Sequence, residues 1–195
     1  MAINYFKIRD NIGSIFFYWC FHNQFKHWGR NTKIFKPLRI EGMKNISLGK
    51  DVRIKNGSWM AALPLTGASD CSIVVGDGTV IGHYNHIYST KCIVIGRNVL
   101  MADKVYISDN LHEYIDINIP ILRQPVRQIG VVHIGDGSWI GENACIMGAR
   151  VGKQCVIGAN SVVTKDIPDY CVAVGAPARV IKHYSFDSLR WELIQ

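Results

Sequence analysis

A repeat of aliphatic residues, most of them six positions apart, is the feature that most constrains the fold of this 195-residue chain. Glycine follows many of these residues, and the repeat runs in two blocks: Val75, Ile81, Ile87, Ile95, Met101 and Ile107, then Ile134, Ile140, Ile146, Val151, Ile157 and Val163. Such a period is typical of short strands joined by tight corners, in which every coil buries its aliphatic residue against its neighbours. The sequence therefore predicts an all-β solenoid with a central column of Val, Ile and Leu.

The repeat also predicts how the chain is divided. We expect an N-terminal cap over residues 1–44, a β-helix over residues 45–175, and a short strand and helix over residues 176–195. Within the β-helix, residues 57–70 are expected to form a loop, and residues 108–130 to be extruded where the repeat breaks off. The C-terminal helix is expected after Ser185, a candidate cap, with Phe186, Leu189 and Ile194 as its apolar positions.

Charge and cysteine usage narrow the class of protein. The net charge of +7 makes an anionic partner plausible, whether a membrane surface, a nucleic acid or a phosphorylated cofactor. No basic run, recognition-helix pattern or zinc-finger pattern is present, which argues against nucleic acid. The six cysteines form no C-x-x-C pair and have no accompanying histidine spacing. They predict a reduced, cytoplasmic protein with neither disulfides nor a metal site.

The N-terminal segment permits two interpretations. The apolar run Ile15–Phe21 is far shorter than the ~20 residues that span a bilayer, and it lacks the cleavage site of a signal peptide. One interpretation is a helix that caps the open end of the solenoid, as terminal repeats require. The other is an interfacial helix beside Lys26, His27 and Arg30 that brings the protein to the inner face of the cytoplasmic membrane.

The segment extruded after Ile107 carries the candidate catalytic residue, His112. A solenoid that interrupts its own stacking usually does so for a functional reason, because binding and catalytic residues concentrate on loops. Imidazole is the side chain best suited to general base chemistry near neutral pH. The alternative is a polar surface residue in a loop without catalytic importance.

Three motifs carry a family resemblance. They are residues 132–141 (VHIGDGSWIG), 156–168 (VIGANSVVTKDIP) and 174–181 (VGAPARVI). Together they resemble the hexapeptide-repeat acetyltransferases, in particular the maltose and galactoside branch and the O-antigen and colanic-acid O-acetyltransferases. The tail, residues 183–192, is similar to the ends of lipopolysaccharide O-acetyltransferases. The resemblance covers Leu48 to the C-terminus. One departure is the corner at residues 146–151, which is a residue shorter than the usual family pattern.

The resemblance implies a left-handed parallel β-helix that assembles as a homotrimer, with acetyl-CoA bound between neighbouring subunits and without a metal. It implies that His112 is catalytic and that Asn85 and Asp109 face a saccharide acceptor. The residues that it assigns to acetyl-CoA are Trp139, Gly141, Glu142, Ala159, Thr164, Lys165 and Arg179.

The chemistry implied is direct transfer without a covalent enzyme intermediate. A sugar hydroxyl needs a base to attack a thioester at neutral pH, and His112 would remove its proton. A backbone N–H near Glu142 would stabilise the oxyanion. A main-chain carbonyl, Asp109 or Glu113 would hold the imidazole in one tautomer, and the sequence leaves this choice open.

Three classes of function are therefore weighed. The first is an acetyl-CoA-dependent O-acetyltransferase that acts on a sugar hydroxyl of a cell-surface polysaccharide precursor, such as O-antigen or capsule. The second is an N-acetyltransferase of a nucleotide-linked amino sugar, built on the same scaffold. The third is a solenoid interaction module without catalysis, against which His112 and the acetyl-CoA residues argue.

Overall fold

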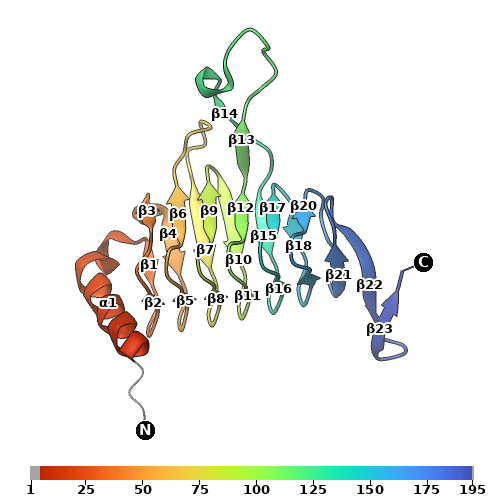
Figure 1. Cartoon of the computed structure of the whole chain (residues 1–195), viewed down its shortest axis with the longest axis horizontal. Helices are drawn as coiled ribbons and strands as arrows, with labels where there is room; N and C mark the ends of the chain where they lie inside the picture. The colour runs from red at the N-terminus through yellow and green to blue at the C-terminus, as the bar shows by residue number, and fades with distance from the viewer. Residues whose placement is uncertain (1–4, 195) are drawn as a thin grey trace.

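The chain coils into a prism whose three sides are β-sheets of parallel strands, one of them extended by an antiparallel hairpin at the C-terminal end (Figure 1). The computed structural model describes residues 5–194. Sheet A contains β1 (His27–Trp28), β4 (Ile46–Leu48), β7 (Ser72–Val75), β10 (Cys92–Ile95), β15 (Val132–Ile134) and β18 (Arg150–Val151). Sheet B contains β2 (Lys33–Ile34), β5 (Arg53–Ile54), β8 (Val80–Ile81), β11 (Leu100–Met101), β16 (Trp139–Ile140), β19 (Val156–Ile157), β21 (Cys171–Val174), β22 (Arg179–Ser185) and β23 (Arg190–Leu193). Sheet C contains β3 (Arg39–Glu41), β6 (Trp59–Ala62), β9 (His86–Ser89), β12 (Tyr106–Ser108), β17 (Cys145–Met147) and β20 (Val162–Val163).

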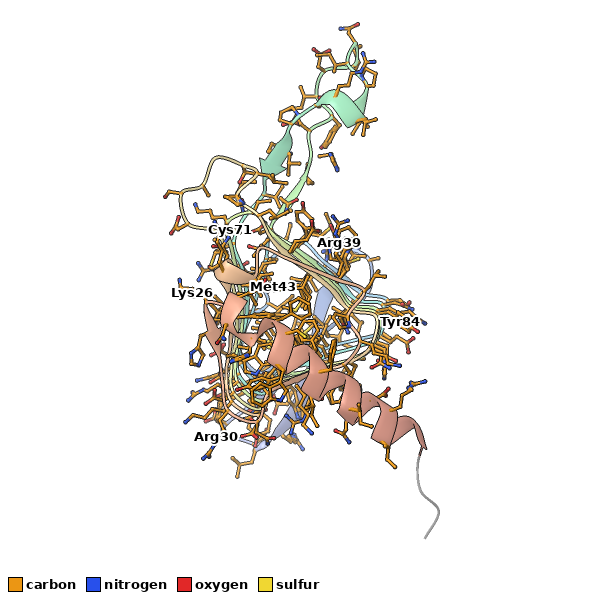
Figure 2. The ribbon with its side chains drawn as sticks, turned by 90° about the vertical axis from the view of Figure 1, so that its left-hand side faces the viewer. Lys26, Arg30, Arg39, Met43, Cys71 and Tyr84 are labelled. Atoms are coloured by element: carbon orange, nitrogen blue, oxygen red, sulfur yellow. The ribbon has the colours of Figure 1, made fainter. Side chains whose placement is uncertain are left out.

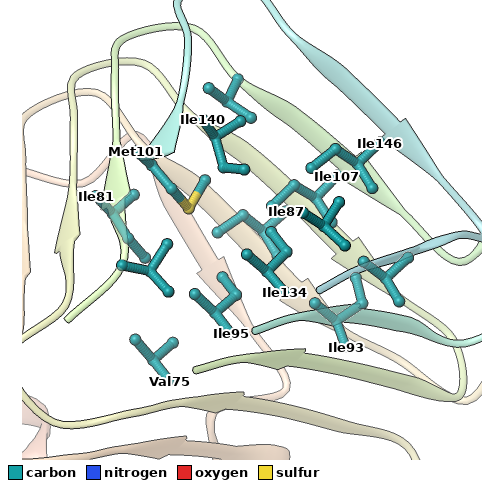
Figure 3. Close-up of a cluster of buried hydrophobic side chains, with 14 of the residues drawn as sticks. Val75, Ile81, Ile87, Ile93, Ile95, Met101, Ile107, Ile134, Ile140 and Ile146 are labelled. Carbon is teal, nitrogen blue, oxygen red and sulfur yellow. The ribbon is translucent and has the colours of Figure 1, made fainter. Parts of the chain in front are cut away.

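The aliphatic repeat forms the core, as the sequence predicts. In sheet B, Met101 pairs with Ile81 on one side and Ile140 on the other, so inward side chains stack from coil to coil. All three are fully buried or within 1% of it, and the column continues along the other two sheets (Figure 3). Burying an Ile side chain contributes roughly 1.5–3 kcal/mol. The column therefore stabilises the prism along its whole length.

Three corners join the sheets, and we name them by the sheets that they connect. In the view along the solenoid, Arg30 marks the A/B corner, Tyr84 the B/C corner and Cys71 the C/A corner (Figure 2). The A/B and B/C corners turn through a left-handed residue in each coil. Asn98, Asn143 and Asn160 are three of these residues, and asparagine is among the residue types that adopt this conformation most readily.

Two predicted boundaries are wrong. The solenoid begins before residue 45, because β1, β2 and β3 pair in parallel with β4, β5 and β6 and form a first coil. Residues 57–70 are not loop throughout, since β6 (Trp59–Ala62) pairs with β9. The first coil was missed because it lacks the aliphatic-glycine pairs that mark the later ones, and the strand β6 (Trp59–Ala62) contains no such pair either.

The helix α1 (Tyr5–Phe21) covers the N-terminal end of the solenoid (Figures 1 and 2). Phe17 and Phe21 pack against the core cluster together with Trp28. The cap interpretation is therefore confirmed for this face of the helix. The aromatic run is divided between two faces, however, because Phe16 and Trp19 point outward and are 69% and 73% exposed.

The expected C-terminal helix is wrong. β22 and β23 form an antiparallel hairpin that extends sheet B, with Tyr184 opposite Trp191. The Ser185 hydroxyl accepts a hydrogen bond from Ser188 N at 3.3 Å, so it closes the tight turn between the two strands. A serine that caps a turn gives the same sequence signal as one that caps a helix. Leu189 in the left-handed region ends the turn.

Candidate active site

The extruded segment is a hairpin that projects from the C/A corner (Figure 1). Its strands β13 (Asn110–His112) and β14 (Val126–Gln128) pair antiparallel, and His112 lies opposite Val126. A short 3-10 helix, Ile121–Arg123, lies between these two strands in the sequence. The Gln124 side chain donates hydrogen bonds to the carbonyls of Asp116 and Ile119, which ties the tip of the hairpin together. His112 is thus held on a strand, and its side chain is exposed.

Asp109 anchors this hairpin to the solenoid. Its carboxylate is fully buried and accepts hydrogen bonds from the amides of Thr90, Lys91 and Cys92 at 2.8 Å each. The side chains of Ser89, Thr90 and Asn110 supply three more donors. Burial by itself would raise the pKa of Asp109, but these hydrogen bonds outweigh it and the pKa is lowered.

The carboxylates expected near the imidazole of His112 have other partners. Both carboxylate oxygens of Asp109 accept hydrogen bonds from donors at the C/A corner. Glu113 pairs with Arg127 at 3.1 Å and accepts a hydrogen bond from Tyr114 N. Within one chain, neither acid is therefore in a position to set the tautomer of His112.

Trp139 lies on the outer face of sheet B, in a column of outward side chains. Its register partners are Leu100 and Val156, and Val80 continues the column beyond Leu100. Trp139 and Leu100 are each about half exposed, at 50% and 51%. This apolar strip is a surface on which an extended, partly apolar ligand can lie.

Gly141, Glu142 and Ala159 stack at the B/C corner beside this strip. A Cβ on Gly141 would lie 2.5 Å from Ala159 N, so the corner admits no side chain there. Gly141 N donates to Ile157 O at 2.8 Å, which removes this amide from the donors available to an oxyanion. Glu142 is exposed and pairs with Lys104 at 3.0 Å.

Thr164, Lys165 and Arg179 are exposed at the C-terminal end of the solenoid. Val162 N donates to Gly175 O, and Ala178 N donates to Val162 O, both within 2.9 Å. These two bonds bring the start of β22, with Arg179, next to β20 and the residues that follow it. The three residues therefore lie at one end of the solenoid.

The two residues expected to face an acceptor are internal. Asn85 is 1% exposed, and its amide bridges coils by donating to Ala102 O and accepting from Val105 N. Asp109 is saturated by the six donors described above. Both predictions of direct acceptor contact are therefore wrong for this chain: the two side chains shape the corners on which the site is built.

The structure separates the remaining candidates onto two edges of sheet C. His112 belongs to the hairpin at the C/A corner, whereas Gly141 and Glu142 lie at the B/C corner, between β16 and β17. A rung of sheet C with its flanking residues spans on the order of 15 Å. One thioester carbon cannot contact both edges of the same chain.

Sequence reasoning missed an aromatic cluster on the sheet C face between these edges. Trp59 stacks on His86 at 4.2 Å between ring centroids, and Tyr88 and Tyr106 meet the His86 ring edge-on. Burial lowers the pKa of His86. The two-residue alternation of β9 could have identified His86 and Tyr88 as outward neighbours.

Within residues 5–194, no three His, Cys, Asp or Glu side chains converge as metal ligands would. No helix in this range has the length and apolar character needed to cross a bilayer.

The comparisons with known proteins agree with this architecture. Residues 131–165 match the family model described as the hexapeptide repeat of succinyl-transferase. WbbJ of Escherichia coli, named for O-acetyl transfer in lipopolysaccharide biosynthesis, is 38% identical over 84% of this chain and 85% of its own length. The galactoside O-acetyltransferase of the same organism is 38% identical over 80% and 79%. A Mycobacterium tuberculosis protein named as an acetyltransferase is 42% identical over 64% of this chain, but the match spans only 41% of that longer protein.

A solved structure shares the fold. It is the N-acyltransferase AntD from Bacillus cereus, crystallised with dTDP and 3-hydroxybutyryl-CoA, with a TM-score of 0.69 at 20% identity over 93% of this chain and 89% of that chain. The repeat, the three-sheet prism with its extruded hairpin and the near full-length relatives lead to one assignment. The chain belongs to the hexapeptide-repeat acetyltransferases.

Proposed function

We propose that this protein transfers the acetyl group of acetyl-CoA to a hydroxyl of a saccharide that becomes part of a cell-surface polysaccharide. The observation that carries the proposal is His112, an exposed imidazole on a hairpin that a buried carboxylate anchors to the solenoid. WbbJ and the galactoside O-acetyltransferase support the choice of an oxygen acceptor.

The complete site requires two copies of the chain. His112 and the Glu142 corner lie on opposite edges of sheet C, so His112 of one copy would meet the Trp139 strip and Glu142 of the next. A contact between two different edges repeats head to tail and closes into a ring when the rotation allows it, and the family resemblance implies three copies. The proposed assembly is therefore a trimer of left-handed β-helices with three equivalent sites.

Each part of the shared site has a chemical task. The apolar strip with Trp139 would hold the pantetheine arm, and Thr164, Lys165 and Arg179 would face the phosphates at the C-terminal end. The Glu142 amide is the proposed oxyanion donor, because Gly141 N is used inside the solenoid. These residues fit acetyl-CoA as a substrate that runs along the prism.

The reaction follows from these positions. His112 accepts the proton of the sugar hydroxyl while its oxygen attacks the thioester carbon. The C–S bond breaks, and the protonated imidazole returns the proton to the leaving thiolate. Since Asp109 and Glu113 are engaged elsewhere, we propose that a main-chain carbonyl or a group of the neighbouring copy orients His112.

Acetyl transfer to an amine nitrogen is the second candidate function. We retain it because AntD, which shares the fold, is named as an N-acyltransferase. Incubation with acetyl-CoA and parallel panels of neutral glycans and amino sugars, read by mass spectrometry, identifies the acceptor class. Mild alkali removes acetyl esters and leaves acetyl amides in place. Alkali-labile product supports O-acetylation, stable product supports the N-acetyl alternative, and no product on any acceptor would favour a solenoid interaction module.

We also propose that α1 contacts an anionic membrane surface at the cytoplasmic side. Its outward residues Ile8, Ile12, Ile15, Phe16 and Trp19 recur at helical spacing and are 47–73% exposed. Residues 1–60 contain eleven Lys and Arg against three Asp and Glu, a net charge of +8, so the remainder of this +7 chain is net −1. Apolar side chains and positive charge at one end are the combination that an anionic bilayer attracts.

Vesicle co-sedimentation tests this contact. The protein should bind anionic phosphatidylglycerol vesicles and release them as salt rises, and Phe16→Ser with Trp19→Ser should weaken binding in a folded protein. Leu193→Ser, at the opposite end of the solenoid, is the control. Absence of binding at low salt would leave α1 as a structural cap.

A further inference from the structure

A cleft of about 580 Å³ lies between α1 and the outer edges of the first three coils. The helix contributes Asn11, and the coils contribute Lys33, Arg53, Lys55, Asn56 and His83. None of these residues has a task in the mechanism proposed above. The cleft is large enough for a small ligand.

The cleft carries positive charge that the protein does not neutralise. Lys33, Arg53 and Lys55 are half-buried, and no carboxylate in the described part of the chain pairs with them. Lys33 Nζ donates to Asn11 Oδ1 at 3.0 Å, and Arg53 donates to main-chain carbonyls, so their partners are neutral. The one carboxylate in the lining, Asp10, pairs with Arg9. Three cations around one cavity attract a group with more than one negative charge.

The lining also contains a buried amide oxygen. Asn56 Oδ1 is inaccessible to solvent and receives no hydrogen bond from the described residues. Because this oxygen is closed to solvent, it does not contact a ligand in the cleft, and recognition there rests on the three cations. Among the acceptors of the proposed reaction, a phosphorylated saccharide carries the negative charge that these cations attract.

The cleft lies in line with the proposed site. Lys33 pairs in register with Arg53, Arg53 with Val80, Val80 with Leu100, and Leu100 with Trp139. Arg53 is therefore three strands, or about 14 Å, from Trp139 on the same outer face. The residues proposed for acetyl-CoA continue from Trp139 toward the C-terminus, which leaves the N-terminal direction for the acceptor.

We infer that this cleft binds the phosphate or diphosphate group of the acceptor, and that the acceptor is a phosphorylated saccharide whose reacting hydroxyl reaches His112 of the neighbouring copy. The inference rests on the proposed function for the direction of the acceptor. Two sources share this chemistry: a soluble nucleoside-diphosphate sugar and a lipid-linked sugar diphosphate, the latter being presented at the membrane surface beside α1.

Calorimetric titration of the purified protein tests the inference without turnover. The probes are inorganic pyrophosphate, UDP-glucose, a short-chain prenyl-diphosphate-linked sugar in micelles, and neutral glucose. We expect pyrophosphate to bind, and Arg53→Gln with Lys55→Gln to weaken it at least tenfold. Lys50→Gln, an exposed lysine at the same end but outside the cleft, should change nothing. Asn11→Asp adds a carboxylate without removing a cation and should also weaken binding. The tighter of the two sugar-linked probes identifies the source.

Several outcomes overturn the inference. No binding of pyrophosphate to the wild type, or equal weakening by Lys50→Gln, would mean that the cleft is not an anion site. Weakened CoA binding in the double variant would assign the cleft to the coenzyme instead. Pyrophosphate binding that persists in a protein without any acetyl transfer would disprove the proposed function and leave the anion site standing.

Discussion

The B/C and C/A corners of the prism border the same sheet, yet they are built differently. Every B/C turn from Lys36 to Asn160 passes through a left-handed residue, and its length hardly varies. The C/A turns range from the two residues Thr90 and Lys91 to the hairpin that carries His112. The regular corner provides a straight edge along which a long ligand can lie. The irregular corner can change its length without disturbing the core, so it can carry the proposed catalytic residue, His112.

The largest expected effect is at the irregular corner. His112→Ala should lower acetyl transfer by about 10²–10⁴-fold, because the general base is removed. Thermal unfolding should be unchanged, since the His112 side chain is exposed. Turnover within a few-fold of wild type would exclude His112 from proton transfer, and His133→Ala, an exposed histidine on sheet A, is the matched control.

Mixing two inactive variants tests whether the two corners of different chains form one site. His112→Ala lacks the base and Trp139→Asp lacks the strip, so each should be inactive alone. If subunits of a trimer exchange at random, about a quarter of the sites combine an intact base with an intact strip. Mixed samples should regain about that fraction of the wild-type rate. No recovery after verified subunit exchange would mean that the site lies within one chain.

Asp109, which anchors the hairpin, should affect the stability of the hairpin more than the rate of acetyl transfer. Asp109→Asn replaces a carboxylate that accepts from six donors and should destabilise the hairpin by about 3 kcal/mol. Amide exchange in β13 and β14 should then rise about a hundredfold. Asp103→Asn at the B/C corner, where one oxygen accepts from His83 N, is the control and should cost about 1 kcal/mol.

The same carboxylate predicts a pH dependence. The pKa of Asp109 is lowered in the folded protein, because its hydrogen bonds outweigh burial. Its stabilisation of the hairpin should be complete above the unfolded pKa of about 3.9 and be lost as the pH falls through the lower folded value. Amide exchange of the wild-type hairpin should follow this course, and the exchange of Asp109→Asn should not.

The smallest expected effect is at the regular A/B corner. Gln154 is exposed and has a φ of 52°, which costs a residue with a Cβ about 1 kcal/mol. Gln154→Gly should therefore raise the melting temperature by a few degrees. Gly148→Ala at the C/A corner should lower it, because the new Cβ would lie 2.9 Å from the Ile129 side chain at a φ of 57°. Equal effects of the two changes would contradict the distinction between a regular corner, here A/B, and the irregular C/A corner.

Sequence reasoning reached the parts of the molecule that repeat. The spacing of Ile81, Met101 and Ile140 gave the core, and the interruption after Ile107 gave the hairpin. Sequence reasoning failed where one local pattern fits two structures, as with Ser185, which can cap a helix or a turn. It also failed where a coil lacks the repeat, as with β1 to β3. The family resemblance assigned Asn85 and Asp109 to the acceptor, but the residue type does not reveal whether the polar atoms face a ligand or a neighbouring coil.

The sequence by itself determined the solenoid, its column of aliphatic residues and the position of the extruded hairpin, because a six-residue period leaves one face of every strand to be buried. Only the tertiary structure decided which side chains are available. In the folded chain, Asp109 is buried and accepts hydrogen bonds from six donors. The aromatic residues of α1 are divided between core and surface, and Lys33, Arg53 and Lys55 line one cleft. Hydrogen bonds and burial across coils depend on residues about twenty positions apart, and local sequence patterns do not encode such pairings.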